Sequence, residues 1–93
     1  MRKLGIDYGD SRVGLAITDE LNITVQGLET VHHNGNDKLV LKRLDEILNQ
    51  YSVDTFVIGM PINMDGSKTE RVEVTEKFIH KLRCKFPKIP VET

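Results

Sequence analysis

A chain of 93 residues is long enough for one small domain, and its 29% charged and 39% hydrophobic residues are typical of globular proteins. Its formal net charge of −1 lacks the basic excess that usually marks nucleic-acid binding, although a local basic patch is compatible with that total. No run approaches the roughly 20 apolar residues of a membrane span, and no signal peptide opens the chain, so we expect a cytoplasmic protein that is not in a membrane. Its one cysteine, Cys84, excludes an internal disulfide and is expected to be a free thiol.

The first third of the chain predicts three strands. Residues 3–8 and 12–18 are apolar runs joined by a short turn, and we interpret them as a β-hairpin in which Gly9 can take a positive φ. Residues 24–33 offer a third strand. The first run alternates poorly, as a strand buried on both faces does, so the carboxylate of Asp7 at its end is expected to be buried, where charge is costly.

The remaining chain predicts helices that alternate with strands. We expect four elements, helix, strand, helix and strand, over residues 38–51, 53–59, 68–84 and 90–93. Asn36 or Asp37 can cap the first helix. The last strand begins but has no room to finish, because strands usually need five or six residues. The order βββαβαβ predicts one α/β domain over residues 1–93, with helices packed on a mixed sheet, and we expect this domain to be incomplete at its C-terminus.

Asp7 is the first candidate for chemistry. As a metal ligand it would hold a divalent cation through oxygen, and Mg²⁺ and Mn²⁺ prefer such ligands. As a structural residue it would accept hydrogen bonds from backbone N–H groups of the following turn. The local pattern supports both roles equally, and one carboxylate does not make a metal site, so a second acid has to come from elsewhere.

The residues around Asp7 add a weaker signal. Gly5, Gly9 and Gly14 would let a phosphate approach the backbone closely, or would simply permit the turn and tight sheet packing, and the second role is favoured. The pattern is neither a Walker A loop nor a Rossmann fingerprint, because no Gly-Lys-Ser/Thr follows and the turn leads into a strand. Arg12 could bind a phosphate or pair with an acid.

A second group of candidates follows the strand over 53–59. Gly59-Met60-Pro61 stands at the carboxyl end of this strand, where ligands bind in open α/β sheets. Asn63 could contact a phosphate or a base, and Arg71 could reach the same place from the start of the next helix. The alternative is a structured turn in which Pro61 fixes φ.

The adjacent histidines His32 and His33 are weak candidates for a metal site. Neighbouring residues of a strand point to opposite faces, so the two rings cannot readily chelate one ion. We expect both to be solvated residues at the end of the third strand.

Taken together, the two groups of residues resemble the YqgF family, whose members are described as Holliday junction resolvases and as nucleases that process the 5′ end of pre-16S ribosomal RNA. The first matching block is Gly5-x-Asp7-x-Gly9-x-x-Arg12-x-Gly14-x-Ala16. The second block is Gly59-x-Pro61 with Asn63, Gly66 and Arg71. Two blocks at the matching distance make the resemblance specific, and it runs over residues 1–93.

The resemblance implies an RNase H-like fold and a nuclease in which acids act around Mg²⁺ or Mn²⁺. By this resemblance Asp7 is the catalytic, metal-binding aspartate of the first strand, and Arg12, Asn63 and Arg71 lie near the path of the nucleic acid. Family members continue into a strand that ends in an Asp-Glu-Arg motif, and then into helices with a basic stretch and a late acidic residue. Because the sequence stops at Thr93, we expect the remaining catalytic acids to lie beyond it and the 93-residue piece to have little or no nuclease activity.

Two other classes of function stay open. An actin- or hexokinase-type nucleotide-binding core shares the RNase H-like fold and a similar opening turn, but such proteins need two domains with ATP between them. A non-catalytic module would bind nucleic acid or a protein partner and use Asp7 structurally. The sequence does not distinguish RNA from DNA or Mg²⁺ from Mn²⁺, and it leaves the oligomeric state open.

Overall fold

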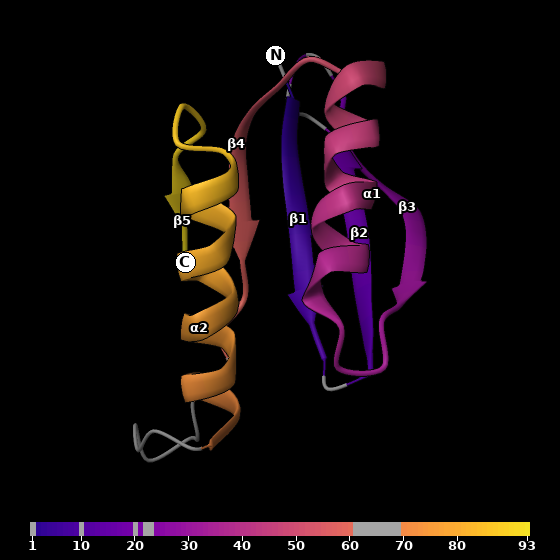
Figure 1. The fold of residues 1–93 in the computed structure, drawn as a ribbon. Coiled ribbons are helices and arrows are strands. Elements are labelled where there is room, and N and C mark those ends of the chain that lie inside the picture. Colours follow the sequence, from indigo (N-terminus) through magenta and orange to yellow (C-terminus); the bar gives the residue numbers. More distant parts are fainter. Residues whose placement is uncertain (1, 10, 20, 22–23, 61–69) are drawn as a thin grey trace.

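A single five-stranded sheet, in the order β3-β2-β1-β4-β5, organises the molecule (Figure 1). The computed structural model describes residues 2–9, 11–19, 21, 24–60 and 70–93. Its elements are β1 (Arg2–Tyr8), β2 (Arg12–Thr18), β3 (Val25–His32), α1 (Asp37–Gln50), β4 (Val53–Ile58), α2 (Glu70–Lys85) and β5 (Val91–Glu92).

The sheet is mixed, as predicted. β1, β2 and β3 form an antiparallel meander, whereas β4 pairs in parallel with both β1 and β5. The predicted element order is confirmed, and the observed bounds of the elements differ from the predicted ones by at most one residue where both are described. The predicted start of the second helix, at residue 68, lies outside the described residues.

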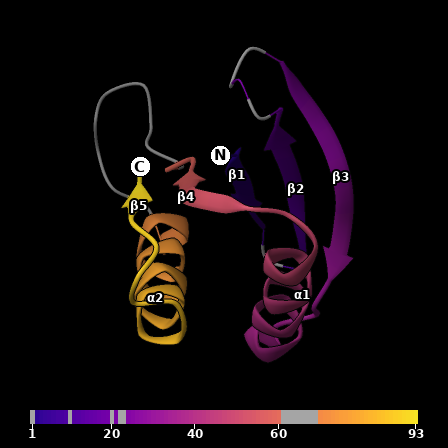
Figure 2. The same cartoon turned by 90° about the horizontal axis from the view of Figure 1, so that it is seen from above.

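Both helices pack on the same face of the sheet (Figure 2). Alternate residues of β1 and β2 point toward them, so Leu4, Ile6, Val13 and Leu15 are buried. The helices complete this core with apolar side chains at helical spacing: Val40, Leu44 and Ile47 from α1, and Val72, Phe78, Ile79 and Leu82 from α2. This layer contains most of the buried apolar surface of the described residues.

The opposite face of the sheet carries no helix among the described residues. β1 therefore alternates, with Ile6 and Tyr8 buried and Asp7 exposed. The prediction that this strand is buried on both faces, and that its carboxylate is buried, is wrong. Strand periodicity turns Asp7 away from the helices and toward solvent.

The turn before α1 depends on left-handed backbone conformations. Asn34 and Gly35 have φ values of 48° and 86°. Asn36 then caps α1, because its side chain accepts a hydrogen bond from the backbone N–H of Lys38 at 3.2 Å, which confirms the first of the two predicted caps. Gly9, by contrast, does not use the positive φ that was predicted for it.

Two expectations about the surface can also be compared with the structure. Within the described ranges, no helix is both long and apolar enough to cross a bilayer. Cys84 is a free thiol, as predicted; it is exposed on α2, and its Sγ lies 3.7 Å from Nε2 of His80.

Candidate functional site

One edge of the sheet collects the features that bind ligands in α/β proteins. β1 and β4 are parallel, and β3 runs in the same direction because both β1 and β3 are antiparallel to β2. The three strands therefore end at this edge, and α1 and α2 begin there (Figure 1). Carboxyl ends of strands and positively polarised helix N-termini both favour anionic ligands at such an edge.

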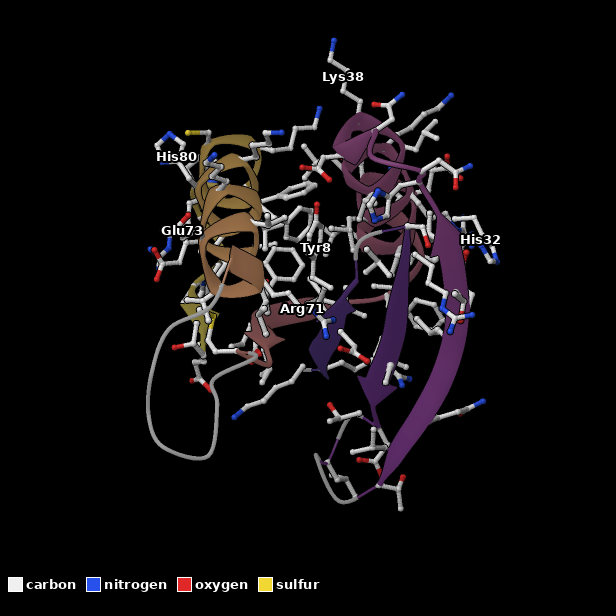
Figure 3. The ribbon with its side chains drawn as sticks, turned by 90° about the horizontal axis from the view of Figure 1, so that it is seen from below. Tyr8, His32, Lys38, Arg71, Glu73 and His80 are labelled. Atoms are coloured by element: carbon white, nitrogen blue, oxygen red, sulfur yellow. The ribbon has the colours of Figure 1, made fainter. Side chains whose placement is uncertain are left out.

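A cavity of about 310 Å³ lies at this edge. Its lining consists of Asp7, Gly9, Arg12, Gly14, Thr30 and Arg71. Asp7 comes from the end of β1 and Arg12 from the start of β2, while Arg71 reaches in from the first turn of α2 (Figure 3). The structure thus brings together three of the four predicted site residues. The fourth, Asn63, lies outside the described residues.

The strand register explains how the cavity is shaped. Asp7 pairs with Gly14, and Gly14 pairs with Thr30, so these residues form a row across three strands. Because Gly14 has no side chain, the space between the Asp7 carboxylate and the Thr30 hydroxyl stays open. Arg12, two residues before Gly14, points to the same face of the sheet. The row and Arg12 together place one carboxylate, one hydroxyl and one guanidinium around a common space.

Thr30 was not among the predicted site residues. The β2–β3 register that places Thr30 opposite Gly14 contains an irregularity between Leu15 and Ala16. A strand-pairing guess made from alternation alone would therefore misplace the residues on one side of the irregularity. No local sequence signal identified this position.

A second cavity, of about 650 Å³, adjoins the first on the uncovered face. The two share Asp7, Gly14 and Thr30. The larger cavity lies over the next row of the sheet, in which β4, β1, β2 and β3 contribute Val57, Gly5, Ala16 and Gly27, and Gly59 lines it just after β4. Gly59 opens the second predicted block, so the two sequence blocks meet in space because β4 lies beside β1. Pro61 and Gly66 of that block lie outside the described residues.

The two histidines differ sharply in environment. His32 is exposed on β3, on the outer side of the sheet (Figure 3), and pairs across the strands with Arg12. His33, by contrast, is only 1% exposed and has both ring nitrogens within hydrogen-bond distance of backbone atoms. The prediction of solvation is therefore confirmed for His32 and wrong for His33. His33 follows the strand and turns inward under Tyr8, where burial requires that its polar atoms be paired.

The donor set for a cation is incomplete among the described residues. They contain no group of three His, Cys, Asp or Glu side chains that could hold a metal ion. Of the acids that the structure describes, Asp7 is the one that lines the smaller cavity, while the carboxylate of Glu29 is committed to Arg43 at 2.6 Å. Hydrogen bonds from Arg43 to Glu29 and Glu46 raise the pKa of that guanidinium. Asp7 therefore fits one ligand of a Mg²⁺ ion, which often takes one or two carboxylates together with water and substrate phosphates.

Similarity to solved structures defines the class of fold. The chain superposes on the structure of T. thermophilus RuvC in complex with a Holliday junction substrate with a TM-score of 0.62 and 18% identity, covering 98% of this chain and 62% of the other. A "putative sugar kinase" from Cytophaga hutchinsonii gives the same TM-score at 22% identity, covering 99% of this chain and 35% of that protein. These likenesses concern the fold alone, and they confirm that the domain is RNase H-like.

The family follows from the sequence as a whole. The family model described as RuvX, Holliday junction resolvase, matches residues 1–93, and the chain belongs to this family. This match confirms the predicted resemblance. A relative from Ruminiclostridium cellulolyticum, named "Putative pre-16S rRNA nuclease", is 55% identical over 82 residues, which are 88% of this chain and 58% of the relative. The chain thus spans less than two thirds of the length of that relative.

Proposed function

We propose that this chain carries the phosphodiester-binding part of a metal-dependent endonuclease that acts on structured RNA, as the name of its relative suggests. The observation that carries the proposal is the convergence of Asp7, Arg12 and Arg71 on one cavity. A guanidinium is suited to the oxygens of a phosphate, and a carboxylate is suited to the hard cation that accompanies one. The three groups together therefore fit a phosphodiester with a bound Mg²⁺ or Mn²⁺.

In this proposal each residue has a separate task. Arg12 and Arg71 hold phosphate oxygens from two different elements and fix the position of the backbone without reading its sequence. Asp7 would be the catalytic carboxylate and would supply one oxygen ligand to the cation. When bound, such an ion neutralises charge on the phosphodiester and makes a water molecule more acidic. Asn63 stays a predicted substrate-binding residue.

The charge distribution agrees with a local anion site. The net charge of the chain is −1, so affinity for nucleic acid has to come from a few placed cations rather than from a general basic surface.

Action on a ribosomal RNA precursor also implies that the protein works in the cytoplasm. Junction DNA, which the RuvX description suggests, presents the same phosphodiester and is the second candidate substrate.

The binding test uses the 93-residue protein, a labelled RNA hairpin and a labelled four-way DNA junction. We expect Arg12→Gln and Arg71→Gln each to weaken binding and to reduce the slope of log affinity against log salt by about 0.7 to 0.9, since each removes one phosphate contact. Lys42→Gln, an equal loss of charge on the exposed surface of α1, is the control and should leave the slope unchanged. Equal effects of all three variants would contradict the proposed site, and tighter binding of the junction would favour DNA.

A second test addresses Asp7. Asp7→Asn should abolish the dependence of RNA affinity on Mg²⁺ or Mn²⁺, because the variant keeps the shape of the side chain and loses the anionic ligand. Since the described residues supply one carboxylate to the cavity, we expect the 93-residue protein to bind RNA without cutting it. Gel analysis of the labelled RNA after incubation with Mg²⁺ measures this directly. Metal-dependent cleavage by the 93-residue protein would overturn that expectation, and unchanged metal dependence in the variant would remove Asp7 from the site.

A further inference from the structure

His33 is buried directly behind the connection between β1 and β2. It follows β3, and its side chain is 1% exposed although its neighbour His32 faces solvent. The backbone N–H groups of His33 and Asn34 both donate to the carbonyl of Ser11, at 2.9 and 3.1 Å. The loop after β3 is therefore bonded to the connection that joins the strands of Asp7 and Arg12.

The surroundings of the His33 ring select one tautomer. Nδ1 lies 3.0 Å from the backbone N of Gly35, and Nε2 lies 2.8 Å from the carbonyl oxygen of Gly9. An N–H group can only donate and a carbonyl can only accept, so Nδ1 must accept and Nε2 must carry the proton. The neutral ring with hydrogen on Nε2 satisfies both contacts. Asp37 Oδ1, at 4.0 Å from Nδ1, is too distant to replace Gly35 as the partner.

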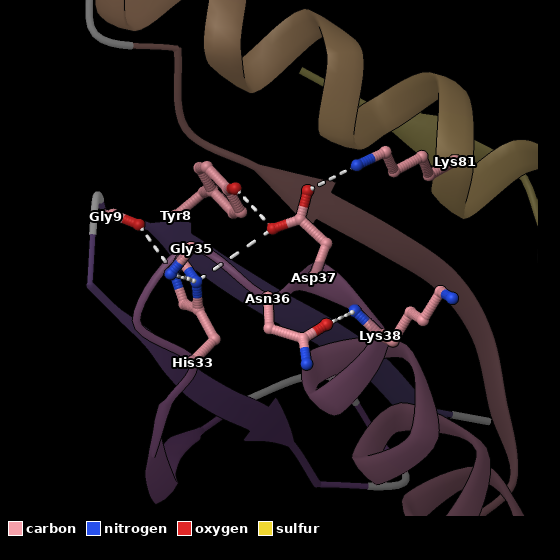
Figure 4. A network of polar contacts seen from close by, with 8 residues as sticks. All are labelled: Tyr8, Gly9, His33, Gly35, Asn36, Asp37, Lys38 and Lys81. Atoms are coloured by element: carbon pink, nitrogen blue, oxygen red, sulfur yellow. Dashed lines mark hydrogen bonds and ion pairs between the residues drawn. The ribbon is translucent and has the colours of Figure 1, made fainter.

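The ring is also held in place from the side (Figure 4). The Tyr8 ring stacks on His33 with 5.4 Å between ring centroids. The Tyr8 hydroxyl donates to Asp37 Oδ1 at 2.5 Å, and Lys81 donates to Oδ2 of the same carboxylate at 3.0 Å. The imidazole therefore has little freedom to rotate away from the Gly9 carbonyl.

The carbonyl that His33 holds belongs to the residue that joins the two halves of the site. Gly9 stands two residues after Asp7, and its N–H donates to the carbonyl of Arg12 at 2.9 Å. A shift of Gly9 would therefore move the end of β1 relative to the start of β2. Asp7, Gly9 and Arg12 all line the same cavity, so this contact lies between the carboxylate and the guanidinium of the site.

We propose that His33 is a positioning residue for the Asp7–Arg12 site: its neutral imidazole donates from Nε2 to the Gly9 carbonyl and so sets the distance between the carboxylate and the guanidinium. The inference rests on the proposed function for its consequence, but its geometry can be tested separately. Groups that hydrogen-bond directly to a metal ligand change metal affinity by roughly 10- to 100-fold when they are replaced. His33 acts through Gly9 and not on Asp7 itself, so we expect an effect at the lower end of that range.

The first experiment needs no variant. The ¹⁵N chemical shifts of the His33 ring in the 93-residue protein report which nitrogen carries the proton, and we expect a protonated Nε2 and an unprotonated Nδ1 at neutral pH. The opposite tautomer would overturn the proposal, because Nε2 could then not donate to Gly9.

The second experiment compares His33→Gln with His33→Leu. The glutamine amide can donate to the Gly9 carbonyl from nearly the same place as Nε2, whereas leucine fills similar space without a donor. In the leucine variant we expect faster hydrogen exchange at the Gly9 amide and a roughly tenfold weaker effect of Mn²⁺ on the NMR signals around Asp7. In the glutamine variant, the exchange rate of the Gly9 amide and the effect of Mn²⁺ should both lie close to their wild-type values. If the leucine variant does not fold, the glutamine variant and the ring tautomer still decide the question.

The control is Leu44→Ala, which destabilises the core from α1 without touching the turn. In this variant we expect no change in the effect of Mn²⁺ on the NMR signals around Asp7. The hydrogen-exchange rate of the Gly9 amide should also be unchanged once it is corrected for global stability. Equal changes in Leu44→Ala and His33→Leu would mean that His33 acts only through stability and would overturn the proposal. If the wild-type protein shows no Mn²⁺ response near Asp7, the cation in the proposed function fails, and the Gly9 exchange rates then decide the role of His33 alone.

Discussion

The absence of a side chain at Gly9 lets the backbone approach Arg12 closely across the turn. A Cβ atom built at this position would lie 2.7 Å from the carbonyl oxygen of Arg12, closer than real Cβ contacts allow. The same carbonyl accepts a hydrogen bond from the Gly9 N–H. The residue is therefore glycine because two backbone segments approach each other closely here, and not because φ is positive.

This close approach leads to a prediction for Gly9→Ala. The added methyl group would push against the backbone of Arg12, so we expect a loss of about 1–3 kcal/mol of unfolding free energy, as in other overpacked sites. Gly59→Ala is the matched control, because a Cβ there meets none of the described residues within 4 Å. Urea unfolding of both variants measures the difference. Equal stabilities of the two variants would contradict the close contact.

At the scale of elements, Asp37 connects three segments that are distant in the sequence. It is the first residue of α1, its side chain is 12% exposed, and its carboxylate accepts hydrogen bonds from Tyr8 of β1 and Lys81 of α2. Its charge also lies at the positive end of the α1 dipole. A second ion pair, between Arg43 and Glu29, ties the middle of α1 to β3. Polar contacts of this kind hold the helices in register with the strands that carry the cavity.

We expect the two members of the Asp37–Lys81 ion pair to contribute unequally to the free energy of unfolding. Asp37→Asn removes the charge at a largely buried point and should cost about 1–3 kcal/mol, because hydrogen bonds to charged groups are worth that much. Lys81→Gln should cost less than about 1 kcal/mol, since the lysine side chain is 55% exposed and well solvated. Asp45→Asn, an exposed position on the same helix, serves as the control. Chemical denaturation gives all three values, and a larger loss for the lysine variant would refute this ranking.

At the scale of the whole molecule, the two faces of the sheet have different roles. Both helices cover one face (Figure 2) and bury its large apolar side chains. The described part of the other face presents small residues such as Gly5, Ala16 and Gly27 to the larger cavity. The site lies where this open face meets the carboxyl ends of the strands. The fold thus separates the stabilising core from the surface proposed to receive the phosphodiester.

This difference between the two faces predicts that substitutions at two neighbouring residues of β2 change the free energy of unfolding by very different amounts. Leu15→Ala should cost about 2–5 kcal/mol, because it leaves a cavity in the core beneath the helices. Ala16→Ile should change stability by less than about 1 kcal/mol, since its neighbours across the strands, Gly5 and Gly27, leave room for the larger side chain. Thermal or urea unfolding of the two variants tests the assignment of the faces. A large loss for Ala16→Ile would mean that the second face is packed.

The predictable part of the site was the part encoded in short stretches of sequence. Asp7 and Arg12 flank one tight turn, so their proximity follows from five residues of chain. Thr30 was missed because its place depends on strand pairing across an irregularity. His33 was misjudged because a histidine after a strand has no local pattern that distinguishes solvent from a buried pair of backbone partners.

The sequence by itself determined the elements and their order, because helix and strand periodicity, caps and turns are properties of neighbouring residues. The family followed from the resemblance of its two motif blocks to known proteins. Only the tertiary structure decided which face of the sheet Asp7 occupies. Parallel pairing of β1 with β4 then placed the start of α2, and with it Arg71, at the same edge as Asp7. Contacts between residues so far apart in the chain depend on how whole elements pack, and no local pattern in the sequence specifies them.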